Sequence, residues 1–364
     1  MTKNKTGVGE YTTELLSSVF ALDKSNQYFL FYNSAEDVSV QIPKWTGENI
    51  HYVHTRWPNK LLNISLKLFN WPKLDKLTGQ IDVWFAPNLN FTALSKKTKF
   101  ILTVHDLSFE FFPEFSTLRQ RLWHKIINPK KQCQRADTIL VPSENTKRDL
   151  VDYYKIPAEK IKTIYPGLSS IFANPVSEKE KIKIKYNLPQ HFILFLGTIE
   201  PRKNILGLID AFEKSYSSLP LPYSLVIAGA PGWKNKKIYE RTEKSPLKDK
   251  IKFIGYVESE DKPALYASAS LFVYPSFYEG FGFPVLEALA SGVPTITTNR
   301  SSLPEITGPS AYLVNARYPG QLSEAITKLL TDQNLRERQT KNGLVQAEKF
   351  KWKKAAEEFL DTIK

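Results

Sequence analysis

The feature that most constrains the fold is a repeated alternation of short apolar segments with longer helical patterns. Strands that alternate with helices form parallel sheets with helices on both faces, which makes this an α/β chain. Ligands bind such sheets at the carboxyl ends of the strands. The strand-like segments are Ile81–Phe85, Phe100–Val104, Thr138–Val141, Phe192–Leu196, Ser224–Ala228, Ile251–Ile254, Leu271–Tyr274 and Thr295–Thr298.

The chain has 364 residues, which is long for one core and suits two domains. The alternation breaks near Tyr165–Ser170, and the charged stretch Ser177–Lys185 starts a new unit. We therefore expect a first domain over residues 1–172 and a second over 173–347. Two doubly wound domains that face each other would form a cleft between the carboxyl ends of their sheets.

Residues 348–364 form an amphipathic helical pattern. From the residues alone, this helix is expected to cap the second domain. Its apolar face comprises Phe350, Trp352, Ala356, Phe359 and Ile363.

The composition favours a cytosolic protein. Cys133 is the one cysteine, so no intrachain disulfide can form. No apolar run is long enough to span a membrane, and the N-terminal residues lack the apolar core of a secretory signal.

A net charge of +13 attracts nucleic acid, anionic lipid or phosphorylated substrates, and the charge by itself does not indicate which of these is the partner. Residues 59–76 mix Lys with Leu, Phe and Trp at helical spacing. This pattern is typical of a helix at a membrane interface, and equally of an amphipathic helix packed on its own domain.

Two carboxylates interrupt the apolar stretch YEGFGFPVLEALASG, which otherwise predicts a buried helix. The free N–H groups at such a helix start attract phosphate, and Gly280 and Gly282 would let a ligand approach the backbone. Glu287 would then hold the vicinal hydroxyls of a ribose, and Glu279 would reach what the phosphate carries. The alternative is a loop residue at Glu279 and an ion pair at Glu287.

Two further segments place polar residues directly after strands. Arg202 and Lys203 follow Phe192–Leu196 and could clamp a diphosphate, although adjacent basic residues in a turn are usually solvated. His105 follows Phe100–Val104 and is the histidine best placed for a cleft, although a structural role is equally open.

Other catalytic signatures are missing from the sequence. It contains no Asp-x-Asp, no Cys/His cluster, no phosphate-binding P-loop and no G-x-S-x-G. We therefore expect no metal and no cofactor.

Taken together, the segments resemble the glycosyltransferases of family 4, a retaining family with the GT-B fold of two facing Rossmann-like domains. Glu279 and Glu287 match the family's E-x7-E motif within YEGFGFPVLEALASGVP. GTIEPRKNILGLIDAF, LVIAGAPGW and IKFIGYVESEDKPALYASASLFVYPS follow the expected order. TGVGEYTTELL, VHDLSFEFFPEF, ADTILVPSENTKRDL and IYPGLSSIF fit its mannosyltransferase-like branch.

The resemblance implies roles for single residues. Arg202 and Lys203 would hold the donor diphosphate, Glu279 the transferred sugar and Glu287 the ribose, with His105 approaching the sugar from the first domain. The terminal helix would cross back onto the first domain. Further donor-binding residues would be Gly7 and Gly9 at the phosphates and Thr198 in the turn before Arg202. Gly255, Tyr256 and Val257 would lie near the base, and the backbone of Gly280, Phe281, Gly282, Phe283 and Pro284 would line the sugar and phosphate.

Two departures from the family pattern stand out. Thr198 replaces an arginine found in many relatives, so phosphate contacts would rely more on Arg202. Relatives also begin with a strand before the Gly7–Gly9 turn, and MTKNKT is no strand. Since that strand is central in the fold, we expect either a misassigned start or a truncated first domain.

The function expected from the resemblance is transfer of a hexose, most simply mannose from GDP-mannose, to a saccharide acceptor in surface polysaccharide synthesis. The acceptor could be lipid-linked, with the enzyme in the cytosol or in peripheral contact with anionic lipid at the inner face of the plasma membrane. No nucleic acid partner is expected. The alternative is a non-catalytic GT-B protein that binds nucleotide, glycan or nucleic acid.

Overall fold

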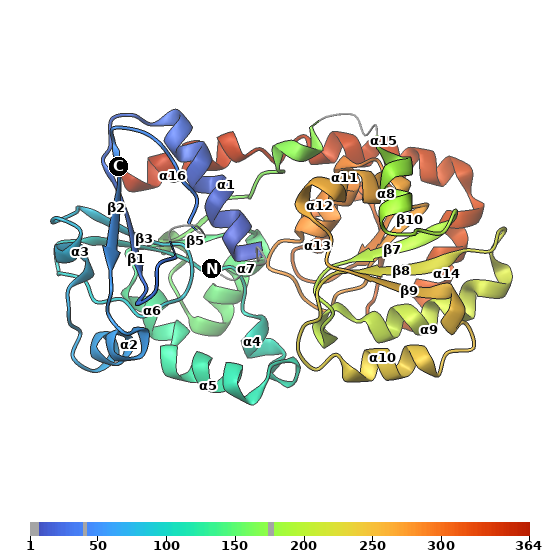
Figure 1. Cartoon of the computed structure of the whole chain (residues 1–364), viewed down its shortest axis with the longest axis horizontal. Helices are drawn as coiled ribbons and strands as arrows, with labels where there is room; N and C mark the ends of the chain where they lie inside the picture. Colours follow the sequence, from blue (N-terminus) through green and yellow to red (C-terminus); the bar gives the residue numbers. More distant parts are fainter. Residues whose placement is uncertain (1–6, 39–41, 174–177) are drawn as a thin grey trace.

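The computed structural model describes residues 7–38, 42–173 and 178–364, which form two lobes, each built on parallel strands with helices around them (Figure 1). The expectation that the family's first strand is missing before Gly7 concerns residues 1–6. Part of the predicted domain boundary falls on residues 174–177. Both lie outside the described residues.

The second lobe contains one six-stranded parallel sheet in the order β12-β11-β10-β7-β8-β9. Its first strand, β7, lies in the interior of the sheet, and the later strands add on either side of it, so the sheet is doubly wound. The strands are β7 Phe192–Leu196, β8 Ser224–Ala228, β9 Ile251–Gly255, β10 Leu271–Tyr274, β11 Thr295–Thr298 and β12 Tyr312–Val314.

Among the residues that the structure describes, eight α-helices lie around this sheet. All residues of β7, β10 and β11 are buried, as expected for strands covered on both faces. The helices are α8 Lys179–Lys185, α9 Ile205–Ser215, α10 Lys236–Glu243, α11 Lys262–Ser268, α12 Phe283–Ala290, α13 Leu303–Thr307, α14 Pro319–Thr331 and α15 Gln333–Ala347.

The first lobe holds a four-stranded parallel sheet and a separate parallel pair of strands. The four-stranded sheet runs in the order β3 Val83–Ala86, β4 Lys99–Thr103, β5 Thr138–Val141 and β6 Ile161–Thr163. The pair consists of β1 Tyr28–Asn33 and β2 Ile50–Thr55. The two sheets meet through side chains, since the rings of Phe31 in β1 and Trp84 in β3 lie 5.7 Å apart.

Helices cover both faces of the four-stranded sheet. On one face, Leu62 and Leu66 of α2 join a hydrophobic cluster with Leu102 and Ile139. Residues 59–76 therefore pack on their own domain, as one of the two sequence interpretations predicts. The helices of this lobe are α1 Gly7–Leu22, α2 Asn59–Leu68, α3 Leu74–Leu77, α4 Ser108–Phe111, α5 Leu118–Ile127, α6 Pro129–Arg135 and α7 Glu144–Asp149.

The last helix, α16 (Trp352–Ile363), crosses back from the second lobe and packs against α1 (Figure 1). Trp352 lies 5.7 Å from the ring of Tyr11, and Phe359 lies 4.8 Å from the ring of Phe85. The expectation of a returning helix is confirmed. The expectation that this segment caps the second domain is wrong for α16, because the apolar face of α16 completes the core of the first lobe.

The first prediction concerns Phe359, which is 3% exposed. We expect Phe359→Ala to destabilise the first lobe by about 3–5 kcal/mol, because removing a buried ring leaves a cavity. Urea unfolding followed by tryptophan fluorescence measures the effect, and Leu344→Ala, at a side chain 44% exposed, is the control. Equal transition midpoints for the two variants would show that α16 contributes little to this core.

Candidate active site

The structure brings together two loops that are far apart in the sequence. Strands β7 and β10 are neighbours in the sheet, and the chain leaves them toward opposite sides, which makes this pair the topological switch point. The turn after β7 carries Arg202 and Lys203, and the loop after β10 carries Glu279. Because parallel strands end at the same edge, these side chains meet where an α/β sheet binds ligands.

Glu279 is buried, with 7% of its surface exposed, and its carboxylate accepts hydrogen bonds from four side chains. Its Oε1 accepts hydrogen bonds from Lys203 Nζ at 2.6 Å, from Ser276 Oγ at 2.6 Å and from Tyr274 Oη at 3.1 Å. Its Oε2 accepts from Arg202 Nη1 at 3.1 Å. Glu279 and the Arg202–Lys203 pair, which the sequence analysis singled out in separate segments, therefore lie in contact, and neither cation is a solvated surface residue.

The charges of this cluster shift the pKa values of its members. Burial alone raises the pKa of Glu279, but the charges of Arg202 and Lys203 outweigh burial and lower it to about 2. Burial and the neighbouring guanidinium of Arg202 lower the pKa of Lys203, so its charge depends on Glu279 staying ionised. The carboxylate therefore keeps two cations in place at the switch point.

Arg202 is fixed from a second side by Glu200. The guanidinium donates from Nη2 to Glu200 Oε1 at 2.8 Å and from Nη1 to the backbone carbonyl of Tyr278 at 2.7 Å. Burial opposes the charge on Arg202, but Glu279 and Glu200 raise its pKa above the ordinary value. The arginine is thus rigidly oriented and cationic.

Glu287 lies on α12 and takes part in a separate ion pair. Its Oε1 accepts from Lys262 Nζ at 3.1 Å and its Oε2 from Tyr266 Oη at 2.9 Å. Lys262 also lies 3.8 Å from Glu10 of α1, which belongs to the first lobe. Glu287 is therefore ion-paired, as the alternative sequence interpretation states, and its contact with a ribose stays a prediction.

His105 approaches the same region from the first lobe. Its Nε2 lies 2.8 Å from the carbonyl of Pro87, and its ring makes an edge contact of 4.9 Å with Tyr11. Burial lowers the pKa of His105, so the ring is neutral at ordinary pH. A Cβ on Gly280 would lie 2.0 Å from the carbonyl oxygen of His105, so Gly280 allows the two lobes to touch here.

The helix predicted around Glu287 is α12, which begins at Phe283 with Pro284 in its first turn. Gly282 precedes it with φ +117°, a conformation that favours glycine. At this start the N–H groups of Val285 and Leu286 donate to the carbonyl of Gly282 at 3.0 and 3.1 Å, and Pro284 has no N–H. The expected row of free N–H groups is therefore corrected, and the positive end of the helix dipole is what α12 offers to an anion. Phe281 points its ring into a hydrophobic cluster with Leu286, so its side chain is a core residue.

The remaining predicted donor residues lie at the edges of this region. Thr198 is exposed after β7, Gly255 ends β9 with φ +73°, Tyr256 is 37% exposed and Val257 is buried. The expected glycine turn before the first helix is corrected. Gly7 and Gly9 lie within α1, described over Gly7–Leu22, and not in a turn.

Several residues at the site were missed by the sequence reasoning. Glu200 precedes Arg202 by two residues, and that short spacing was an available signal. Tyr274 and Ser276 lie five and three residues before Glu279, but neither carries a charge that marks it. Lys262 and Glu10 carry no local signal, because the packing of α11 on α12 and the approach of α1 bring them to the ion pair of Glu287.

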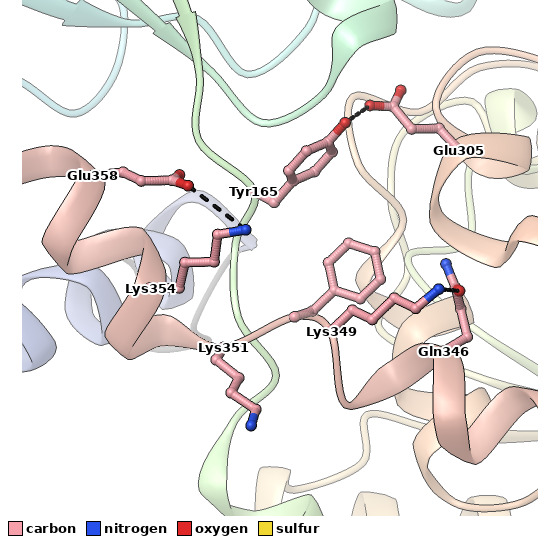
Figure 2. Close-up of a pocket in the computed structure, with 8 residues that line it drawn as sticks. Tyr165, Glu305, Gln346, Lys349, Lys351, Lys354 and Glu358 are labelled. Atoms are coloured by element: carbon pink, nitrogen blue, oxygen red, sulfur yellow. Dashed lines mark hydrogen bonds and ion pairs between the residues drawn. The ribbon is translucent and has the colours of Figure 1, made fainter.

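A second carboxylate joins the lobes away from the switch point. Glu305 accepts hydrogen bonds from the backbone N–H of Glu144 at 2.7 Å and of Asn145 at 3.2 Å, at the start of α7. It also accepts from Tyr165 Oη at 2.5 Å, as Figure 2 shows. A cavity of about 240 Å³ lies beside this contact, lined also by Lys351 (Figure 2), and not over Glu279.

Within residues 7–38, 42–173 and 178–364, no group of three or more His, Cys, Asp or Glu side chains is placed to hold a metal ion. Over the same residues, no helix has the length and apolar character needed to cross a membrane.

Comparison with known families agrees with this geometry. Residues 7–170 match the glycosyltransferase family 4 domain, and residues 176–346 match the glycosyl transferases group 1 domain. The fold and the site define a GT-B glycosyltransferase. The chain belongs to the glycosyltransferase family that joins a family 4 first domain to a group 1 second domain.

Relatives and solved structures are similar over most of the chain. The O-antigen chain mannosyltransferase B of Escherichia coli is 34% identical over 76% of this chain and 72% of its own length. The serotype-specific mannosyltransferase WbdA of Escherichia coli is 33% identical over 63% of this chain but only 29% of its own length. A Rickettsia africae glycosyltransferase has a TM-score of 0.74, with 18% identity, 99% coverage of this chain and 95% of its own. Anabaena HepE, solved with UDP and glucose, has a TM-score of 0.74, with 17% identity, 100% coverage of this chain and 97% of its own.

The second prediction tests the contact between Gly280 and His105. We expect Gly280→Ala to lower kcat/KM for sugar transfer at least tenfold, because the added Cβ forces the two lobes apart at the site. The control is Gly320→Ala, where an added Cβ meets nothing within 4 Å. Full activity of Gly280→Ala would show that this close approach is not needed for catalysis.

The third prediction follows from the lowered pKa of Glu279. The ordinary pKa is 4.5 and the folded value about 2, so the stabilisation is fully present above pH 4.5 and is lost as pH falls toward 2. Between pH 7 and pH 3 we expect the wild type to lose about 2 kcal/mol more unfolding free energy than Glu279→Gln, which cannot titrate. Urea titrations at each pH measure the difference, and parallel pH profiles would contradict the assignment.

Proposed function

We propose that this chain is a retaining, metal-independent mannosyltransferase. It transfers mannose from GDP-mannose to a saccharide acceptor during synthesis of a surface polysaccharide, acting in the cytosol or at the inner face of the plasma membrane. The observation that carries the proposal is the buried cluster of Glu279, Arg202 and Lys203 beside the start of α12.

The cluster supports binding of a sugar joined to a diphosphate. Arg202 and Lys203, together with the positive end of the α12 dipole, form a site for phosphate oxygens. A hydrogen bond from either cation to a phosphate oxygen is charge-assisted and stronger than a neutral one. Glu279, anchored by both cations, offers a carboxylate to sugar hydroxyls. The choice of mannose is supported by the relatives, since the O-antigen chain mannosyltransferase B and WbdA are named for that sugar.

The proposed chemistry needs little proton transfer from the protein. With retention, the acceptor oxygen bonds to the anomeric carbon on the face from which the diphosphate departs, and the departing phosphate oxygen takes the acceptor proton. Catalysis then rests on positioning and on neutralising the leaving diphosphate by Arg202 and Lys203. The neutral ring of His105 donates from Nε2 to the carbonyl of Pro87, so its Nδ1 can accept a hydrogen bond from a sugar hydroxyl without adding charge.

A donor panel tests the proposal. The protein is incubated with GDP-mannose, GDP-fucose, UDP-glucose and dTDP-rhamnose, and donor cleavage is followed with and without chelator. We expect GDP-mannose to be cleaved fastest and chelator to have no effect. Proton NMR of the transferred mannoside then gives the anomeric configuration, and an inverted product would overturn the retaining assignment.

The fourth prediction concerns the carboxylate itself. We expect Glu279→Ala to lower kcat at least 100-fold while binding of GDP, measured by calorimetry, changes less than tenfold. Asp210→Ala removes a carboxylate from an exposed ion pair with Arg241 in the same lobe, and it should keep wild-type turnover. Unchanged turnover in Glu279→Ala would remove this residue from the reaction.

A further inference from the structure

Helix α2 carries a second apolar stripe on the side opposite to its core contacts. Leu62 and Leu66 are buried in the first lobe, whereas Leu61, Ile64 and Leu68 are 61%, 52% and 66% exposed. Their spacing of three and four residues puts the exposed side chains on one face of the helix. The helix therefore packs on its own domain and still presents a full row of apolar side chains to solvent.

Helix α5 repeats this arrangement. Its inner side is fixed by Ile127, which is buried, and by the ring of His124, which stacks on Phe109 at 4.1 Å. Leu118 and Leu122 on its outer side are 82% and 58% exposed. Two neighbouring helices of the same lobe thus expose large apolar side chains.

Both helices cover the same side of the four-stranded sheet. Trp123 of α5 contacts the ring of Phe91 at 5.4 Å, and Phe91 packs on the cluster that holds Leu62 of α2. Figure 1 shows α2 and α5 along the lower edge of the first lobe. We call the following exposed side chains the docking surface: Leu61, Ile64, Leu68, Phe69 and Trp71 from the α2 segment, and Leu118, Leu122, Trp123 and Ile126 from α5.

The two segments that carry the docking surface contain no acidic residue. Residues 56–74 and 118–136 contain ten Lys and Arg residues and no Asp or Glu. Lys60 and Lys67 on α2, and Lys125 on α5, are exposed beside the apolar rows. These two segments carry a charge of +10, most of the net charge of +13 of the whole chain.

We propose that the docking surface binds the headgroup region of an anionic lipid bilayer. Large apolar side chains with tryptophan enter the interface, and the surrounding cations face the lipid phosphates, as in membrane-surface helices. Each Lys or Arg near such a surface adds attraction, which salt weakens. The same surface on a soluble monomer would be an unusually large exposed apolar patch.

The charge pattern favours lipid over a second copy of the chain. Two copies that met through this surface would bring Lys60, Lys67 and Lys125 of each copy together with those of the other, and like charges repel. The inference deepens the proposed function, because it names the surface through which the enzyme would approach a lipid-linked acceptor. The proposal concerns binding to lipid alone, so the result of its test does not depend on which donor sugar the enzyme uses.

The test is co-sedimentation of the full chain with vesicles, without donor or acceptor. Vesicles of phosphatidylglycerol and phosphatidylcholine are compared with vesicles of phosphatidylcholine alone. We expect binding to the anionic vesicles, a weakening of at least tenfold between 50 and 500 mM NaCl, and a weakening of at least tenfold in the double variant Leu68→Glu, Leu122→Glu. The matched control is Leu344→Glu, Val345→Glu, which adds the same two charges at exposed apolar positions of α15 and should bind like the wild type.

A second variant separates loss of binding from loss of folding. Lys60→Gln, Lys67→Gln and Lys125→Gln leave the apolar rows intact and should reduce the salt-sensitive part of the affinity at least threefold. The proposal is overturned if the wild type ignores anionic vesicles at 50 mM NaCl, or if the Leu68→Glu, Leu122→Glu variant binds them as the wild type does. It is also overturned if light scattering shows a dimer that this variant converts to monomer, since the occupant would then be a second copy.

Discussion

The site depends on one interaction, the ion cluster in which the buried carboxylate of Glu279 binds Arg202 and Lys203. Each of these charges would be unfavourable if it were buried without a partner. Together with Glu200, the two carboxylates and two cations neutralise one another. The cluster joins the loops after β7 and β10, so it also fixes the geometry at the switch point of the sheet. A phosphorylated ligand that arrives here meets cations already oriented, which lowers the reorganisation needed on binding.

Much of the fold could be predicted because most strands of the second lobe are short, mainly apolar and bounded by turns. Five strands have the predicted bounds, namely β5 in the first lobe and β7, β8, β10 and β11 in the second. Strands β1, β2, β6 and β12 were missed. Their residues alternate with exposed or charged side chains, since these strands lie at edges or in the small sheet, and such segments resemble loops.

The candidate site was predictable where chemistry and local spacing coincide. Glu279, Arg202 and Lys203 could be singled out because a charge next to an apolar strand end or helix demands a partner. Tyr274 and Lys262 could not, since a tyrosine at the end of a strand and a lysine at a helix start are ordinary surface patterns. The sheet order β10-β7 and the contact between α11 and α12 turn both residues inward, and neither contact is visible in local sequence. Glu305 was missed for the same reason, because its partners Glu144 and Tyr165 belong to the other lobe.

The return of α16 has a consequence for how the chain is made. The core of the first lobe contains Tyr11, from near the beginning of the sequence, and Phe359, from near its end. Translation delivers these residues hundreds of codons apart, so the lobe that leaves the ribosome first has an uncovered apolar face until α16 emerges. The second lobe can reach its native packing earlier than the first, and the order of folding is then the reverse of the order of synthesis.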